Sequence, residues 1–191
     1  MRPDILTATG CYFDFLTPER SKFGIVDVAH ALSNICRFCG HTRKFYSVAQ
    51  HSVYVSLLVP PSDALAGLLH DAAEAFIGDV AKPLKQLLPD YVALERRVEG
   101  AVFKRFGLPP TLPDSVKQAD RFMLHMEQRD LMAKHDDVWE CSIDLPQIDR
   151  PPFFPERINP WSPASSRSTF LDRYSELTGA NYLGGYSHAD Q

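Results

Sequence analysis

The sequence predicts an all-α fold, and three observations support this. Apolar residues recur at helical spacing in several separate stretches, cap residues precede these stretches, and glycine or proline follows them. The chain has 191 residues, of which 45% are hydrophobic, and these suffice for one domain with a full-sized core. We therefore predict one domain over residues 1–191, with a helical core over about 27–135 and a C-terminal extension over 139–191.

The N-terminal third contains an irregular segment and two helices. Residues 7–24 are punctuated by glycine and proline, which favours a short hairpin or an irregular strand pair. A first helix begins at Asp27 as its cap, and apolar residues follow at helical spacing. A second helix begins at Ser47, which forms a capping box with Gln50, and it stops before Pro60.

A third helix carries an unusual set of titratable side chains. It begins at Ser62 or Asp63, runs through strong helix formers and ends at Gly78. Charged groups on an apolar helix face are costly unless they are paired or bind a cation. The apolar run "LLHDAAEAFIGD" nevertheless holds His70, Asp71 and Glu74 inside the helix and Asp79 just beyond its end. This helix is therefore the first candidate for a functional site.

Two further helices precede a proline-rich segment. Residues 80–90 predict a loop and a short helix, and residues 91–106 form an amphipathic helix that Gly107 closes. The next helix has Asp114 as its cap, and Asp120 shares a face with apolar neighbours, so we expect Asp120 to be buried or to line a pocket. The members of that face are Asp120, Leu124, Glu127 and Leu131.

The C-terminal extension begins irregularly and ends in a helix. Residues 144–163 are rich in proline, which excludes a regular helix or a central strand. A last helix over 163–178 follows Ser162 and ends at Gly179.

The composition narrows the classes of partner and compartment. A net charge of −4 and a pI near 5.9 argue against a nucleic-acid polymer as partner but permit a small anionic substrate. The sequence has no signal-peptide pattern and no apolar stretch near the roughly 18 residues of a membrane span, so we expect a reduced, cytoplasmic protein that binds no membrane. Cys36 and Cys39 form a CxxC, which we interpret as two small hydrophobes along one helix face rather than a metal or redox pair.

Imidazole and carboxylate ligands together suit a divalent first-row metal ion. His70 and Asp71 supply one such pair, and the candidates for the remaining ligands are His51 and Asp120. Taken singly, His51 could also be a core or capping histidine, and Asp120 could pair with a basic neighbour. Glu74, one turn after His70, could act as acid or base beside the metal, or it could be an exposed helix carboxylate.

These residues and the sequence segments around them resemble the motifs of a known superfamily. "SVAQHS" holds His51, "LLHDAAEAFIGDVAKPLK" holds His70 and Asp71, and "VKQAD" ends at Asp120. In this order they resemble the HD-domain phosphohydrolase superfamily, in particular its bacterial 5′-deoxynucleotidase branch and the related phage dATP triphosphohydrolases. The resemblance covers roughly residues 27–131. It implies an HD-domain helical bundle in which His51, His70, Asp71 and Asp120 bind one divalent metal ion: Mn, Co, Zn or Mg.

The resemblance also implies a reaction. The expected activity is hydrolysis of the 5′ phosphoester of a (deoxy)nucleotide to nucleoside and phosphate, with Glu74 and Asp79 at the reacting centre. Two alternatives remain open: a deoxynucleoside triphosphate triphosphohydrolase that releases tripolyphosphate, and a noncatalytic nucleotide-binding protein. The resemblance further suggests a homo-oligomer whose other partner is the small-molecule nucleotide.

Substrate contacts are implied for an Arg-aromatic pair and for basic loops. Arg37 and Phe38 resemble the pair that the family uses for phosphate and base, although family members carry tryptophan at the second position. Loops that flank the expected site hold basic residues that could bind further phosphates or form a solvated surface. These residues are His41, Arg43, Lys44, Lys82 and Lys85.

Overall fold

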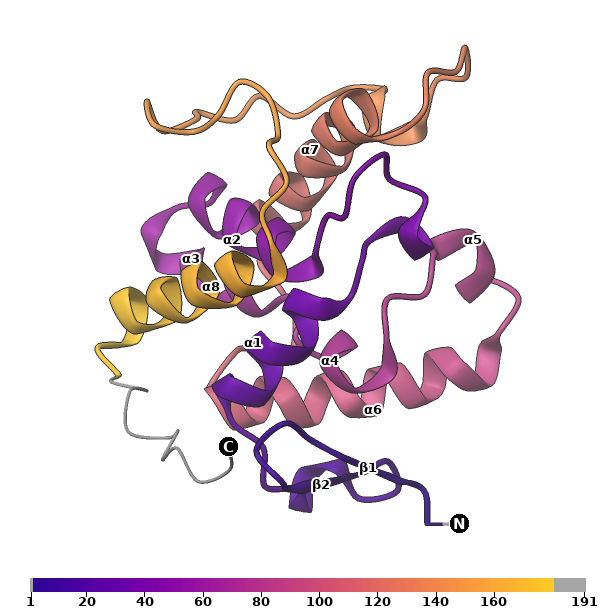
Figure 1. The fold of residues 1–191 in the computed structure, drawn as a ribbon, viewed down its shortest axis with the longest axis vertical. Coiled ribbons are helices and arrows are strands. Elements are labelled where there is room, and N and C mark those ends of the chain that lie inside the picture. The colour runs from indigo at the N-terminus through magenta and orange to yellow at the C-terminus, as the bar shows by residue number, and fades with distance from the viewer. Residues whose placement is uncertain (1, 181–191) are drawn as a thin grey trace.

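The computed structural model describes residues 2–180, and within them it confirms the all-α fold. Helices α2 (Val48–Leu58), α3 (Ala64–Leu69) and α8 (Pro163–Thr178) pack together in the middle of the molecule (Figure 1). Helix α1 (Ile25–Asn34) lies against both α2 and α8. Helix α2 therefore sits at the centre of the packing, and ten of its eleven residues are buried.

The other elements lie on either side of this centre. Helix α7 (Asp114–Leu131) packs on α2 at one end of the molecule, and α6 (Pro89–Phe106) lies beside the N-terminal hairpin at the other end (Figure 1). The hairpin is an antiparallel pair of short strands, β1 (Asp4–Leu6) and β2 (Tyr12–Asp14); the sequence predicted a strand pair, but within residues 7–24, and β1 lies before that range. No helix among residues 2–180 is long and apolar enough to cross a membrane.

Two hydrophobic clusters hold these elements together. In the first, the ring of Phe13 stacks on Phe76 with centroids 3.8 Å apart, which fastens the hairpin to the helices. In the second, Tyr54 of α2 packs edge-on against Phe154 and Trp161 of the proline-rich segment. The second cluster therefore makes the C-terminal extension part of the folded unit.

Several predicted helix ends are confirmed, and one of them has an additional role. Ser47 Oγ accepts the Gln50 N–H at 3.2 Å, as expected of a cap. The Gln50 side chain does not complete the capping box; it donates to the Asn159 carbonyl at 2.9 Å and accepts the Trp161 N–H at 2.8 Å. Gln50 thereby connects the C-terminal extension to α2 through two hydrogen bonds. Gly107 and Gly179 close α6 and α8 in the left-handed conformation.

The helix predicted over residues 62–78 is not continuous. Helix α3 ends at Leu69, residues 70–73 form a turn, and α4 covers Glu74–Ile77. In a continuous helix the Gly67 carbonyl would accept the Asp71 N–H; here it accepts the His70 Nδ1–H at 2.8 Å, and the next backbone bonds span three residues. The break therefore lies at the His-Asp pair.

Three smaller predictions are wrong. Asp27 is the third residue of α1, where its carboxylate accepts the Gly24 N–H at 3.0 Å instead of capping as the first residue. Asp114 begins α7 without a cap bond from its side chain. Cys36 pairs through its backbone with Ser47, and Cys39 is exposed in a 3-10 turn at φ 52°, so the two cysteines share no helix face.

Candidate metal centre

Three helices bring together the group of side chains that could hold a metal ion. His51 comes from α2, His70 from the end of α3, and Asp120 from the middle of α7, and their ligand atoms lie within 4.8 Å of one another. His51 Nε2 lies 3.3 Å from His70 Nε2 and 3.1 Å from Asp120 Oδ1. Both histidines are buried, whereas 46% of the Asp120 side chain is exposed, so the group opens to solvent on the α7 side.

The chemistry of this group fits a divalent cation. The His70 Nδ1–H is committed to the Gly67 carbonyl, so in the neutral form of the ring the Nε2 lone pair points at the His51 Nε2 atom. Without a cation, a hydrogen bond between the two nitrogens requires a second proton on one of the rings. A divalent cation between them lets both rings stay neutral and uses both lone pairs. Imidazole nitrogens with a carboxylate oxygen are ligands that Zn²⁺, Co²⁺ and Mn²⁺ accept.

Asp71 adjoins the group of three. Its Oδ2 atom lies 3.2 Å from His70 Nε2 and 3.7 Å from His51 Nε2. Burial opposes its ionisation, but the charges of His70, His51 and Arg37 outweigh burial and hold the pKa of Asp71 well below its usual range. Asp71 is therefore an ionised carboxylate beside the group of three, and its role as a fourth ligand stays a prediction.

A buried carboxylate that the sequence analysis left without a role stands behind His51. Glu127 has an exposed fraction of 0%, and its Oε1 atom lies 2.6 Å from His51 Nδ1. Arg37 donates to Glu127 Oε2 through Nε at 3.2 Å, and its Nη2 lies 3.1 Å from the same oxygen. The available signal was the spacing: Glu127 lies seven residues after Asp120, two turns along the same helix face.

The charges around His51 favour its protonated form when no metal is bound. Burial and the Arg37 charge lower the pKa of His51, but Glu127 and Asp120 raise it, to a net value of about 9. Burial also acts against the Glu127 charge, yet Arg37 and His51 bring the pKa of Glu127 below its usual value. The pair is thus an imidazole held against an ionised carboxylate.

Glu74 and Asp79 lie beside this group as acids of a different kind. Glu74 begins α4 and is 7% exposed, and its Oε2 atom has no hydrogen-bond partner among residues 2–180. Burial, and then the charges of Asp71 and Asp79, raise the pKa of Glu74 well above its usual value. Burial likewise raises the pKa of Asp79. Burial and the neighbouring carboxylates therefore favour the protonated form of Glu74 more than in an exposed glutamate.

Of the expected substrate-binding residues, Arg37 contacts a candidate ligand and Phe38 lies beside Arg37. The Arg37 guanidinium reaches the centre, with Nη1 3.5 Å from Asp71 Oδ2, and its central carbon lies 5.5 Å from the centroid of the Phe38 ring. The Phe38 ring lies 6.1 Å from the ring of Trp139, a residue to which the sequence analysis gave no role. Arg37, Phe38 and Trp139 thus place a cation and two aromatic rings side by side.

The remaining basic residues are not bonded to the four candidate ligands. His41, Arg43, Lys44 and Lys82 are exposed and make no hydrogen bond or ion pair with those ligands in the described structure. The Arg43 guanidinium donates to the Asp130 carbonyl at 2.7 Å, at the end of α7. Lys85 is nearer, because its charge acts on Glu74 and Asp79, but its Nζ atom pairs with Glu95 at 2.5 Å.

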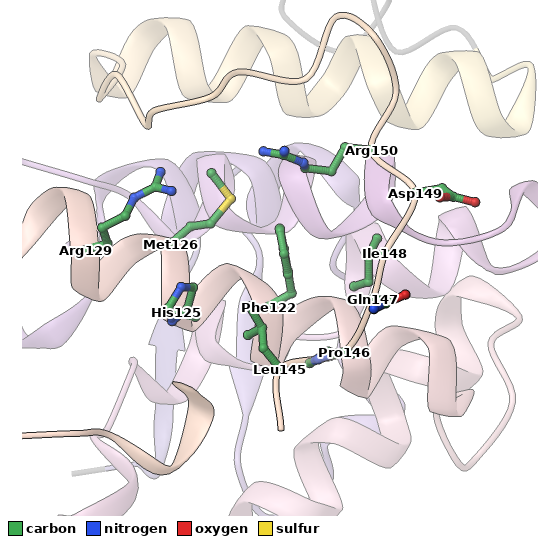
Figure 2. A pocket seen from close by; sticks show the side chains of 10 residues that line it. All are labelled: Phe122, His125, Met126, Arg129, Leu145, Pro146, Gln147, Ile148, Asp149 and Arg150. Atoms are coloured by element: carbon green, nitrogen blue, oxygen red, sulfur yellow. The ribbon is translucent and has the colours of Figure 1, made fainter. Parts of the chain in front are cut away.

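A cavity of about 440 Å³ lies on another face of α7 (Figure 2). Its walls come from α7 and the proline-rich segment: Phe122, His125, Met126, Arg129 and residues 145–150. None of the expected ligand or catalytic residues lines it. Residues 145–150 of the C-terminal extension therefore close against α7 away from the candidate metal centre.

The fold and the site define an all-α protein with a His/Asp group that could hold a metal ion. The uncharacterized protein YfdR of Escherichia coli K12 is 38% identical over 174 residues, which are 91% of this chain and 95% of that protein. The chain belongs to the family of YfdR. An uncharacterized protein of Rhodobacter capsulatus is 39% identical over 121 residues, 58% of this chain and 62% of that protein. No family model matches the sequence.

Proposed function

We propose that this protein is a metal-dependent phosphohydrolase of the HD-domain superfamily that acts on (deoxy)nucleotides. One observation carries the proposal: His51, His70 and Asp120, which lie on three different helices, converge with their ligand atoms within 4.8 Å. Asp71 adjoins them, so the set corresponds to the ligands that the resemblance implies. The expected reaction is hydrolysis of the 5′ phosphoester to nucleoside and phosphate.

The residues of the site divide the chemistry between them. A divalent ion would lower the pKa of a bound water toward ~7 and offset charge on the phosphoryl oxygens. Glu74, which is buried and has a raised pKa, would give a proton to the leaving 5′ oxygen or orient the water. Asp79 would assist or contact the sugar 3′-hydroxyl, and Glu74 and Asp79 could exchange their roles.

The surroundings of Arg37 support a nucleotide as substrate. Arg37 would contact the phosphate from beside Asp71, and a guanidinium suits this because it can bind two oxygens at once. Phe38 and Trp139 offer aromatic faces on which a base could stack.

The distribution of positive charge favours a monophosphate over a triphosphate. Arg37 is already paired with Glu127 and Asp71, and Lys85 is paired with Glu95. The exposed His41, Arg43, Lys44 and Lys82 contact none of the candidate ligands. A tripolyphosphate chain requires more cationic contacts than one phosphate does, so triphosphate hydrolysis ranks second.

The test is a panel of metals and nucleotides. Metal-stripped protein is reloaded with Mn²⁺, Co²⁺, Zn²⁺ or Mg²⁺ and mixed with nucleoside and deoxynucleoside mono- and triphosphates, and released phosphate and tripolyphosphate are measured separately. We expect phosphate release from monophosphates with at least one metal. Tripolyphosphate release would favour the second activity. Nucleotide binding without turnover under any metal would favour a noncatalytic protein. Light scattering on the same sample tests the expected homo-oligomer.

A further inference from the structure

The imidazole of His51 is held from both sides. On one side Nε2 faces His70 and Asp120, at 3.3 and 3.1 Å. On the other side Nδ1 lies 2.6 Å from Glu127 Oε1, and both residues are fully buried. An ionised carboxylate accepts hydrogen bonds but donates none, so the ring must donate its Nδ1–H. With Nδ1 protonated, Nε2 of the neutral ring carries the lone pair that a metal ion needs.

Glu127 is itself fixed by Arg37, which reaches the centre as well. Two guanidinium nitrogens contact Glu127 Oε2, at 3.1 and 3.2 Å, and a third lies 3.5 Å from Asp71 Oδ2. Only 11% of the Arg37 side chain is exposed. A buried, unpaired carboxylate would be strongly destabilising, and Arg37 removes that cost. The contacts thus form one chain that runs from His51 through Glu127 and Arg37 to Asp71.

We propose that Glu127 is the positioning residue of the metal centre: supported by Arg37, it fixes His51 in the tautomer and ring orientation that direct Nε2 at the ion. This inference rests on the metal centre of the proposed function. It gives Arg37 a second role beside phosphate binding, because Arg37 links the carboxylate behind one ligand to Asp71. Carboxylates that orient a metal-bound histidine typically change metal affinity by roughly 10–100-fold when they are replaced.

The first test uses the unaltered protein, so it does not depend on a variant that folds. Protein with ¹⁵N-labelled histidine is loaded with Zn²⁺, which is diamagnetic, and the His51 ring nitrogens are assigned by NMR. We expect a protonated Nδ1 whose hydrogen exchanges slowly with water, and an unprotonated, zinc-bound Nε2. Zinc on Nδ1, or an Nδ1–H that exchanges as fast as that of an exposed histidine, would overturn the proposal.

The second test compares two buried carboxylates of α7. Glu127→Gln removes the charge behind His51. Asp130→Asn is the matched control, because the Asp130 side chain is only 3% exposed and pairs with an arginine, Arg129 at 2.7 Å, but it contacts none of the candidate ligands. Zinc affinity is measured by competition with a chromophoric chelator. We expect Glu127→Gln to weaken it by roughly 10–100-fold and Asp130→Asn to leave it within about threefold of the unaltered protein.

The outcomes separate this proposal from the one on which it rests. If the unaltered protein binds no Zn²⁺ at His51 and His70, both fail. If it binds Zn²⁺ there and Glu127→Gln, shown to be folded by its circular dichroism, retains full affinity, only the positioning role fails. A loss of affinity in Glu127→Gln accompanied by faster exchange of the His51 Nδ1–H supports the positioning role, since a merely structural substitution would not change that signal.

Discussion

Two faces of helix α7 use polar side chains in different ways. On one face Asp120 and Glu127 contact residues that are distant in the sequence: Glu127 bonds to His51 and Arg37, 76 and 90 positions away along the chain. On the other face, at the cavity of Figure 2, polar groups are satisfied nearby: His125 bonds to Ser142 at 2.8 Å, and Arg129 bonds to Asp130 at 2.7 Å. The polar contacts of the first face therefore form only when three helices are assembled. Those of the second face need only α7 and the segment that follows it.

The largest expected effect separates two histidines. His70→Ala removes one of the three converging ligands, and His125→Ala removes a ring on the other face of α7. We expect His70→Ala to lower zinc affinity by more than about 100-fold, above the usual effect of an outer carboxylate, and to abolish nucleotide hydrolysis. His125→Ala should retain both. Equal losses in the two variants would show that the faces are not independent.

The next effect separates chemistry from metal binding within the first face. Glu74→Gln keeps the size of the side chain but removes the donatable proton. We expect turnover to fall by roughly 10²–10⁴-fold, while zinc affinity stays unchanged because Glu74 is not among the converging ligands. Steady-state kinetics and chelator competition on one preparation measure both. Activity equal to that of the unaltered protein would exclude Glu74 as the acid.

The sequence predicts those features that depend on residues close together along the chain, and it misses features that local patterns do not reveal. Caps at Ser47 and Ser162 and the closing glycine at 107 were predictable, because they depend on neighbouring residues. The helix break at His70 was missed, because it follows from a side-chain bond to a backbone carbonyl that periodicity does not reveal. Glu127 was placed on the correct face without a role.

The site shows the same limit. His51, His70 and Asp120 were grouped because a metal requires several ligands and a resemblance ordered them along the chain, and their ligand atoms do converge. The partner of Glu127 could not be predicted, since its spacing from Arg37 has no local signature. Exposed basic residues such as Lys44 were expected to bind phosphate because their loops flank the site in the sequence; Lys44 is exposed, and this role stays a prediction.

A smaller effect distinguishes the two faces by pH in metal-free protein. The folded pKa of His51, about 9, lies above its unfolded value near 6.5, so its contribution to stability is complete below about pH 6.5 and is lost as the pH rises to about 9. The loss should be about 3 kcal/mol at most. Burial lowers the pKa of His125, so protonation of this ring opposes folding. Its effect on the free energy of unfolding therefore has the opposite pH dependence: stability is lost as the pH falls below 6.5.

Urea unfolding between pH 6 and pH 9, with a chelator present, measures this dependence. Glu74→Gln is the suitable background, because the raised pKa of Glu74 also reduces stability as the pH rises. In that background, stability that is constant from pH 6.5 to 9 would contradict the His51–Glu127 pairing. Zinc should remove the dependence, since a bound metal holds the ring neutral.

The smallest effect concerns packing on the cavity face. Met126 is buried, 1% exposed, and also lines the cavity of Figure 2. Met126→Ala should lower the free energy of unfolding by about 2 kcal/mol, the low end for such truncations, since the site already borders empty space. Zinc affinity should not change. A large loss of zinc affinity in this folded variant would show that packing on the cavity face controls the metal face.

The most direct test of the metal centre is anomalous diffraction from crystals soaked in Mn²⁺ or Zn²⁺ and recorded at the absorption edge of that metal. The account predicts one strong anomalous peak from a metal ion that is bound by Nε2 of His51, Nε2 of His70 and a carboxylate oxygen of Asp120, with Asp71 as the adjacent ligand. Crystals that hold no metal there, or that bind it elsewhere while His51 and His70 remain in contact with each other, would contradict it.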